Sequence, residues 1–187
     1  MTDEEKLLTG SWLDAIGTLI SAAAEIRALA GLNDINNKLV AIGEGLQATG
    51  TFLIGTVTTD DPLNFAGNWI DGAGAATSAL AAYLQDIDEE NEEDSNRLGI
   101  LGDTFQAMGA SISALADHIA GEEEYAIGNA LQGLGAGLEA IGGVYDLRGR
   151  KEGQLITTIG AILQALGSNY GAALLTRETF NLNIDEN

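Results

Sequence analysis

Apolar residues recur along this chain at alternating spacings of four and three, which is a helical pattern. In the first segment they are Trp12, Ile16, Leu19, Ala23, Ile26 and Ala30. A strand would instead alternate apolar and polar residues at a period of two. Spacings of four and three place all six side chains along one face of a helix, as an apolar seam.

A stripe of small residues, mostly glycine, runs beside each seam at a spacing of seven. Its members include Gly10, Gly17, Gly31, Gly43, Gly50, Gly67, Gly74, Gly102, Gly109, Gly121, Gly128, Gly135, Gly142, Gly153, Gly160 and Gly167. Glycine inside a helix costs roughly 1 kcal/mol relative to alanine. We expect close helix–helix approach to offset that cost. The alternative, glycine turns between short strands, is disfavoured because Ala, Leu and Gln between the glycines are helix formers.

The pattern predicts six helices. They cover about residues 2–30, 36–54, 62–86, 96–120, 122–142 and 152–175. Gly31 suits a helix stop, and Pro62, the only proline, follows two aspartates at the clearest break in the chain. The sequence therefore predicts an all-α fold, packed along Gly/Ala stripes at heptad spacing.

The helices repeat in pairs. Ile42-Gly43…Leu46-Gln47 recurs as Leu101-Gly102…Phe105-Gln106 and as Ile159-Gly160…Leu163-Gln164. We predict six antiparallel helices forming three tandem helical-hairpin repeats of about 57 residues (1–55, 62–120 and 121–175) in a single domain, 1–175.

Three charged or tail segments fall outside this pattern. Residues 86–94 are densely acidic and predict a solvated loop, which Arg148, Arg150 and Lys151 could pair with in the same or a neighbouring molecule. The tail, 176–187, alternates Phe180, Leu182 and Ile184 with polar residues. It is either a disordered tail or an extended arm that docks on another surface.

Composition narrows the classes of partner and compartment. A net charge of −20 disfavours nucleic-acid binding and docking on anionic lipid. With no cysteine there is no disulfide or thiolate metal site. The acidic N-terminus is unlike a signal peptide, and no apolar run approaches the ~18–20 residues of a spanning helix. From the sequence we expect a cytoplasmic protein, or one exported without a cleaved signal.

No catalytic, cofactor-binding or metal-binding set is predicted. His118, the single histidine, is interpreted as a surface or interface residue. The acidic stretch fails as a calcium loop because Asn91 and Arg97 stand where Gly and Glu are required, which leaves loose divalent-cation binding. Trp12 and Trp69 are predicted as core anchors.

The repeated glutamines are the most distinctive polar set: Gln47, Gln106, Gln132 and Gln164. They either bond across helices and fix their register, or lie on the solvent edge. The sequence leaves both open.

The segment Leu8–Ile20 and the later Ile-Gly-x-x-Leu-Gln-Ala-x-Gly units resemble a family of repetitive, Gly/Ala-rich proteins from spore-forming bacilli, known only as a domain of unknown function. The resemblance implies no activity, cofactor or site. We expect a non-enzymatic structural or self-assembling protein whose main partner is itself. The alternative is an amphipathic protein that binds lipid or other apolar surfaces.

Overall fold

A computed structural model describes residues 1–87 and 91–180 of the chain. Within these residues the protein has six helices and no strand, which confirms the all-α prediction. The helices are α1 (Asp3–Leu29), α2 (Asn36–Gly55), α3 (Pro62–Ile87), α4 (Glu92–Ala120), α5 (Glu123–Leu147) and α6 (Gly153–Thr179).

Local hydrogen bonds fix where several helices begin and end. At the start of α1, Thr2 Oγ1 accepts from the Glu5 backbone N–H at 3.1 Å, while Glu5 Oε2 accepts from the Thr2 N–H at 2.7 Å. This reciprocal capping satisfies two N–H groups that a helix start leaves free. At the end of α4, Gly121 adopts φ 82°, a left-handed conformation that favours glycine.

Three predicted boundaries are wrong. α4 begins at Glu92 rather than after Ser95, because an acidic first turn complements the helix dipole. α5 continues to Leu147 and α6 to Thr179. Residues 176–179 therefore belong to α6 and not to an arm. Trp12 Nε1 donates to Thr176 Oγ1 at 2.9 Å there. Leu182 and Ile184 lie outside the described residues.

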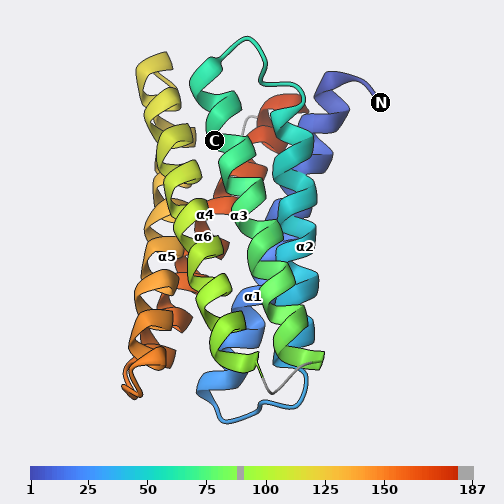
Figure 1. Cartoon of the computed structure of the whole chain (residues 1–187). Helices are drawn as coiled ribbons and strands as arrows, with labels where there is room; N and C mark the ends of the chain where they lie inside the picture. Colours follow the sequence, from blue (N-terminus) through green and yellow to red (C-terminus); the bar gives the residue numbers. More distant parts are fainter. Residues whose placement is uncertain (88–90, 181–187) are drawn as a thin grey trace, which may run out of the picture.

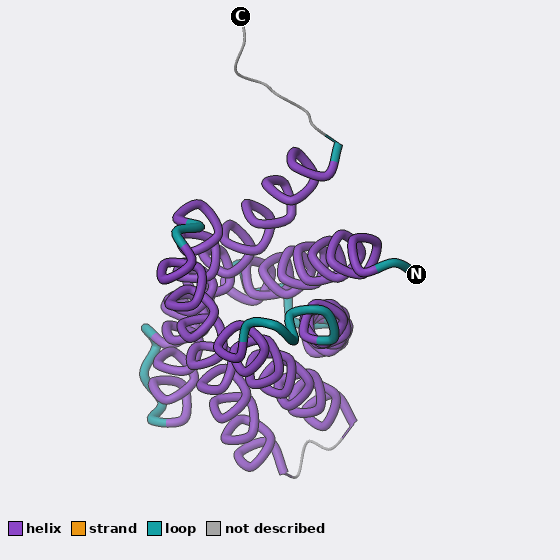
Figure 2. The backbone as a smooth tube through the Cα atoms, turned by 90° about the horizontal axis from the view of Figure 1, so that it is seen from above, coloured by secondary structure: helices purple, strands orange, loops and turns teal. Residues whose placement is uncertain are grey.

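The helices form a closed ring. Each packs against the helix before and after it in the chain, and α6 closes the ring against α1 (Figures 1 and 2). Among the six described helices, no other pair packs backbone against backbone. One end of the ring, the terminal end, holds Thr2, the turn at 56–61, Gly121 and Phe180. The other, the turn end, holds the turns at 30–35 and 148–152 (Figure 1).

Most glycines of the stripes lie at contacts between helices, as predicted, whereas Gly31 and Gly121 lie at helix ends with nothing within 4 Å of an added Cβ. A Cβ added to Gly74 would lie 2.6 Å from the Gly102 carbonyl oxygen, and one added to Gly135 would lie 2.6 Å from that of Gly160. A Cβ on Gly17 would likewise clash with Gly43. These backbones approach too closely for any side chain larger than hydrogen.

The buried side of the ring contains almost no large apolar side chain. Fourteen of its fifteen buried hydrophobic residues are alanine, and the other is Leu174. The remaining buried side chains are polar, and Gln47 and Gln106 are the largest that are completely enclosed.

The apolar seams face outward. The prediction that Trp12 and Trp69 anchor a core is wrong, since they are 39% and 42% exposed. Residues of the same kind are exposed on every helix, among them Ile16, Leu19 and Ile26 on α1, Ile42 on α2, Leu80 on α3, Leu101 and Leu115 on α4, Leu134 on α5, and Ile159 and Leu166 on α6. The ring is therefore polar inside and apolar outside.

Charged side chains avoid the middle of that outer surface. Every exposed charged residue among those described lies in a turn or within six residues of a helix end. Lys38 approaches Asp86 at 3.8 Å. The predicted basic partners of the acidic stretch form no ion pair within the described part of the molecule; they are Arg148, Arg150 and Lys151. The Arg150 guanidinium instead lies 5.2 Å from the centre of the Tyr145 ring.

One described helix, α1, is long and apolar enough to cross a membrane by length and composition. Its most apolar 18-residue window has a mean hydropathy of 1.3 and is 44% buried. From the sequence, no spanning helix is predicted. Core helices of soluble proteins can be as long and as apolar as α1.

Candidate functional site

The repeated glutamines meet near the middle of the ring. Gln47 Nε2 donates to Gln106 Oε1 at 2.8 Å and to Gln164 Oε1 at 3.3 Å. Gln132 Nε2 donates to Asp14 Oδ2 at 2.8 Å. These bonds join α2 to α4 and α6, and α5 to α1. Of the two interpretations that the sequence left open, bonding across helices is confirmed.

Buried carboxyl groups accept the other amide protons of this network. Glu44 accepts from Gln106 Nε2 at 2.8 Å and from Ser21 Oγ at 3.0 Å. Glu139 accepts from Gln164 Nε2 at 2.6 Å. Gln106 and Gln164 each donate to a carboxyl group and accept from Gln47. The network therefore links Glu44 of α2 to Glu139 of α5 through three amide side chains.

Five helices each contribute one carboxyl group to the middle of the ring. We call them the axial carboxyls: Asp14, Glu44, Asp71, Asp103 and Glu139. None of them takes part in an ion pair of the described residues, although exposed acidic groups at the helix ends do. An ionised carboxylate buried without a cation is costly, so such a group needs hydrogen-bond donors or a proton of its own.

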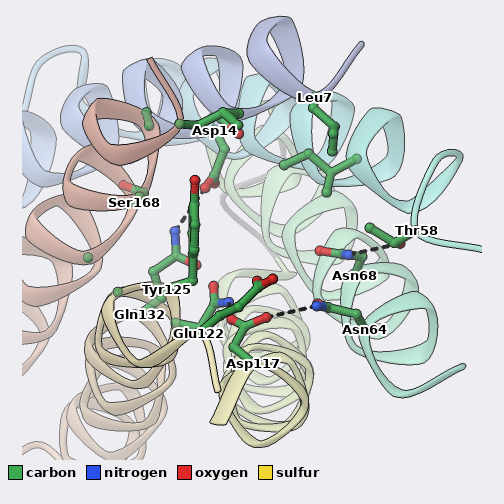
Figure 3. A pocket seen from close by; sticks show the side chains of 18 of the residues that line it. Leu7, Asp14, Thr58, Asn64, Asn68, Asp117, Glu122, Tyr125, Gln132 and Ser168 are labelled. Carbon is green, nitrogen blue, oxygen red and sulfur yellow. Dashed lines mark hydrogen bonds between the residues drawn. The ribbon is translucent and has the colours of Figure 1, made fainter. Parts of the chain in front are cut away.

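A cavity of about 310 Å³ opens the axis at the terminal end (Figure 3). Side chains from all six helices line it, and Asp14, Gln132 and Ser168 lie at its inner limit (Figure 3). Asp14 is only 8% exposed, and its Oδ1 has no hydrogen-bond partner. A residue with a buried, unpaired acceptor therefore lines the cavity.

The mouth of this terminal cavity is also acidic. Asp117 accepts from Asn64 Nδ2 at 2.8 Å and from Asn129 Nδ2 at 2.6 Å. Burial raises the pKa of Asp117 above its usual value, and these two hydrogen bonds oppose the shift. Tyr125 donates its hydroxyl proton to Glu178 at 2.8 Å, and burial together with that bond raises the pKa of Tyr125.

A second cavity, of about 450 Å³, opens at the turn end, and residues of all six helices line it too. Its carboxyl groups are Glu25, Glu92, Asp103, Glu139 and Asp146. Partial burial raises the pKa of Asp146. Among the described residues, neither lysine nor arginine lines this cavity or the terminal one. The ionisable groups of both linings are therefore acidic.

Other residues that the sequence singled out lie away from the axis. The side chain of His118 is 65% exposed, and its Nδ1 is 2.9 Å from Glu123 Oε1, at the outer end of α4. Among the residues that the structure describes, no three His, Asp or Glu side chains are grouped so as to hold a metal ion. The acidic stretch at 86–94 is described only in part.

A family model matches residues 5–172, and its description is a family of unknown function, DUF6944. The chain belongs to this family. No curated protein and no solved structure matches the chain. The family match therefore gives no activity, and the function must be inferred from the structure of the ring.

Proposed function

We propose that this member of the family is a non-enzymatic, membrane-embedded protein whose apolar outer surface lies in lipid. The observation that carries the proposal is the inverted ring, with leucine or isoleucine exposed on every helix and carboxyl and amide groups inside. Water would leave this outer surface exposed at a large hydrophobic cost, whereas lipid tails would cover it.

The height of the apolar surface suits a bilayer. On α1 the exposed large apolar residues run from Trp12 to Leu29 and on α5 from Ile127 to Ile141. At 1.5 Å per residue, such stretches on the helices with three or more of these residues measure between about 21 and 36 Å. The hydrocarbon core of a bilayer is ~30 Å thick. The belt therefore has the dimension that lipid requires.

The edges of the belt also resemble a membrane boundary. Trp12, Phe65 and Trp69 lie toward the terminal end and Tyr83 toward the turn end, and all four are exposed. Amphipathic aromatic rings favour the interface between hydrocarbon and water. The exposed charged residues lie beyond them, near the helix ends.

Lipid covers such a belt better than a second copy of the chain would. A symmetric dimer buries one patch on each copy, whereas exposed apolar residues here occur on all six helices of a closed ring. Self-association is the second candidate, and packed copies could bury the same apolar side chains in a larger assembly. The high negative charge opposes self-association, and physiological salt weakens this repulsion by screening it within ~8 Å.

We also infer that the ring consists of three tandem copies of one antiparallel hairpin. Two observations support this. Contacts run in opposite order along paired helices, since Gly10 meets Gly50 while Gly17 meets Gly43. The motif offsets are 57 to 59 residues, from Gly17 to Gly74 and from Gly43 to Gly102.

Flotation with phosphatidylcholine vesicles, followed by an alkaline carbonate wash, tests the membrane proposal. Neutral lipid is chosen because the chain is strongly acidic. We expect the protein to float with the vesicles and to resist the wash. Replacing Leu134 and Leu166, both 57% exposed and near mid-helix, by lysine should abolish this, since each lysine costs about 3 kcal/mol at the centre of a bilayer.

The matched control is Thr59→Lys, which adds a lysine in an exposed turn at the terminal end. It should float like the parent. A parent protein that stays at the bottom of the gradient would overturn the membrane proposal. Large particles seen by light scattering without lipid would then favour self-assembly.

A further inference from the structure

The axial carboxyls form a series between the two cavities. Hydrogen bonds lead from Glu44 through Gln106, Gln47 and Gln164 to Glu139, and Asp14 accepts a hydrogen bond from Gln132. Asp14 lines the terminal cavity, whereas Asp103 and Glu139 line the turn-end cavity. The series therefore reaches from the solvent-accessible space at one end to that at the other.

The middle of the axis is closed by side chains. Gln47, Gln106 and Gln164 are at most 4% exposed, and none of them lines either cavity. A hydrated cation is too large to pass this layer without displacing it. A proton can pass this layer without displacing it. A protonated carboxyl group both donates and accepts hydrogen bonds, so it can pass a proton to a neighbouring acceptor.

Two unpaired acceptors lie along this series. Asp14 lines the terminal cavity (Figure 3) and its Oδ1 has no partner, and Gln47 Oε1, in a side chain only 1% exposed, also lacks one. Buried acceptors without a donor are rare and ask for an explanation, such as a water molecule or a proton. Asp14 is thus the place where a proton from the cavity can enter.

We propose that the membrane-embedded ring conducts protons along its axis through the axial carboxyls. This inference rests on the proposed membrane function. A proton from water in the terminal cavity binds Asp14, and another leaves Asp103 or Glu139 for water in the turn-end cavity. Only O–H bonds are made and broken, and the direction follows the proton gradient. Ionisable groups inside membrane proteins commonly mark such pathways.

The experiment uses the full chain in phosphatidylcholine vesicles that enclose a pH-sensitive dye. A potassium gradient with valinomycin sets the membrane potential and drives protons inward. We expect the parent protein to acidify the lumen faster than protein-free vesicles do. Asp14→Asn and Glu44→Gln, which keep the shape but cannot exchange an acidic proton, should reduce the rate to the protein-free level. Asp14→Glu should retain conduction.

Glu4→Gln, at an exposed position in the first turn of α1, is the matched control and should conduct like the parent. Flotation and circular dichroism of every variant separate failure to insert or fold from failure to conduct. If the parent floats but acidifies no faster than empty vesicles, the relay is overturned while the membrane proposal stands. Equal rates for the parent and Asp14→Asn, or matching potassium flux without valinomycin, would also overturn it.

Discussion

Adding one methyl group at Gly135 tests whether close helix contact holds the ring together. In Gly135→Ala the new Cβ would lie 2.6 Å from two backbone atoms of α6, the Gly160 oxygen and the Gln164 nitrogen. Backbone atoms cannot turn aside as a flexible side chain can, so α5 and α6 must separate. Such overpacking costs about 1–3 kcal/mol.

The control is Gly45→Ala, also inside a helix, where a Cβ would meet nothing within 4 Å. Here only the intrinsic preference of alanine for helix acts, and we expect stabilisation by up to ~1 kcal/mol. The same preference acts at Gly135, so that variant should lose a net ~0–2 kcal/mol. The two variants should therefore differ by about 1–3 kcal/mol in free energy of unfolding, because the preference for alanine acts in both and the overpacking only at Gly135.

Thermal unfolding in detergent, followed by far-UV circular dichroism, measures the difference. For a domain of this size, 1 kcal/mol shifts Tm by about 2–4 °C, so the two variants should melt roughly 2–12 °C apart. If Gly135→Ala melts at or above Gly45→Ala, the glycine stripe is not a tight interface. A spectrum dominated by strand would refute the helical fold altogether.

Three further predictions follow from the ring. Gln106→Leu should destabilise the protein by about 1–3 kcal/mol, because it leaves Glu44 Oε2 without a donor and Gln47 with only its longer bond to Gln164. Chemical unfolding against Gln85→Leu, at the end of α3, provides the comparison. Gly128→Ala should cost less than Gly135→Ala in the same melting assay, since its Cβ would lie 3.2 Å from the Gly167 oxygen, its nearest contact. The turn end should face the cytoplasm, because basic residues favour the cytoplasmic side and six of the eight lie there: Arg27, Lys38, Arg97, Arg148, Arg150 and Lys151. Since the chain has no cysteine, a membrane-impermeant maleimide should label Thr59→Cys but not Asn33→Cys in intact cells. The reverse result would contradict this orientation.

Much of the fold could be predicted from the sequence. Helix number follows from the apolar spacing, and the contact faces follow from the glycines, because both depend on local geometry. Helix ends were less predictable. The acidic residues 92–94 repel one another, but each is also stabilised by the dipole at the N-terminus of α4. The helix dipole prevails, and α4 begins at Glu92.

The usual rule that large apolar side chains are buried does not predict that the apolar seams face outward. Trp12 and Trp69 were assigned to a core because large apolar residues are normally buried. Helical spacing shows that such residues share a face, but not which side of the ring that face occupies. The decisive fact is that six helices close a ring, and this depends on contacts between α1 and α6, which lie far apart in the sequence.

The axial carboxyls left a signal that the sequence analysis missed. Four residues after a stripe glycine, where the side chain lies on the same helix face one turn later, the residue is repeatedly polar. The pairs are Gly10 with Asp14, Gly17 with Ser21, Gly43 with Gln47, Gly67 with Asp71, Gly102 with Gln106, Gly128 with Gln132, Gly135 with Glu139 and Gly160 with Gln164. Glycine and polar residues together marked the inner face, and only the glutamines were recognised.

The inverted ring gives the glycines a physical reason. In a soluble bundle, helices are held together by burying large apolar side chains between them, and internal glycine is a loss. Here those side chains lie outside, and alanine supplies nearly all of the apolar contact within. Lipid would cover the outer surface equally well on separated helices, so it drives no association. Helices in such surroundings associate by close backbone packing and hydrogen bonds between polar groups, for which small residues are required. The tight Gly135–Gly160 contact and the bond from Gln164 to Glu139 join α5 and α6 in both ways within two turns. Stability and the polar axis therefore arise from the same face of each helix, and a substitution that alters one should alter the other.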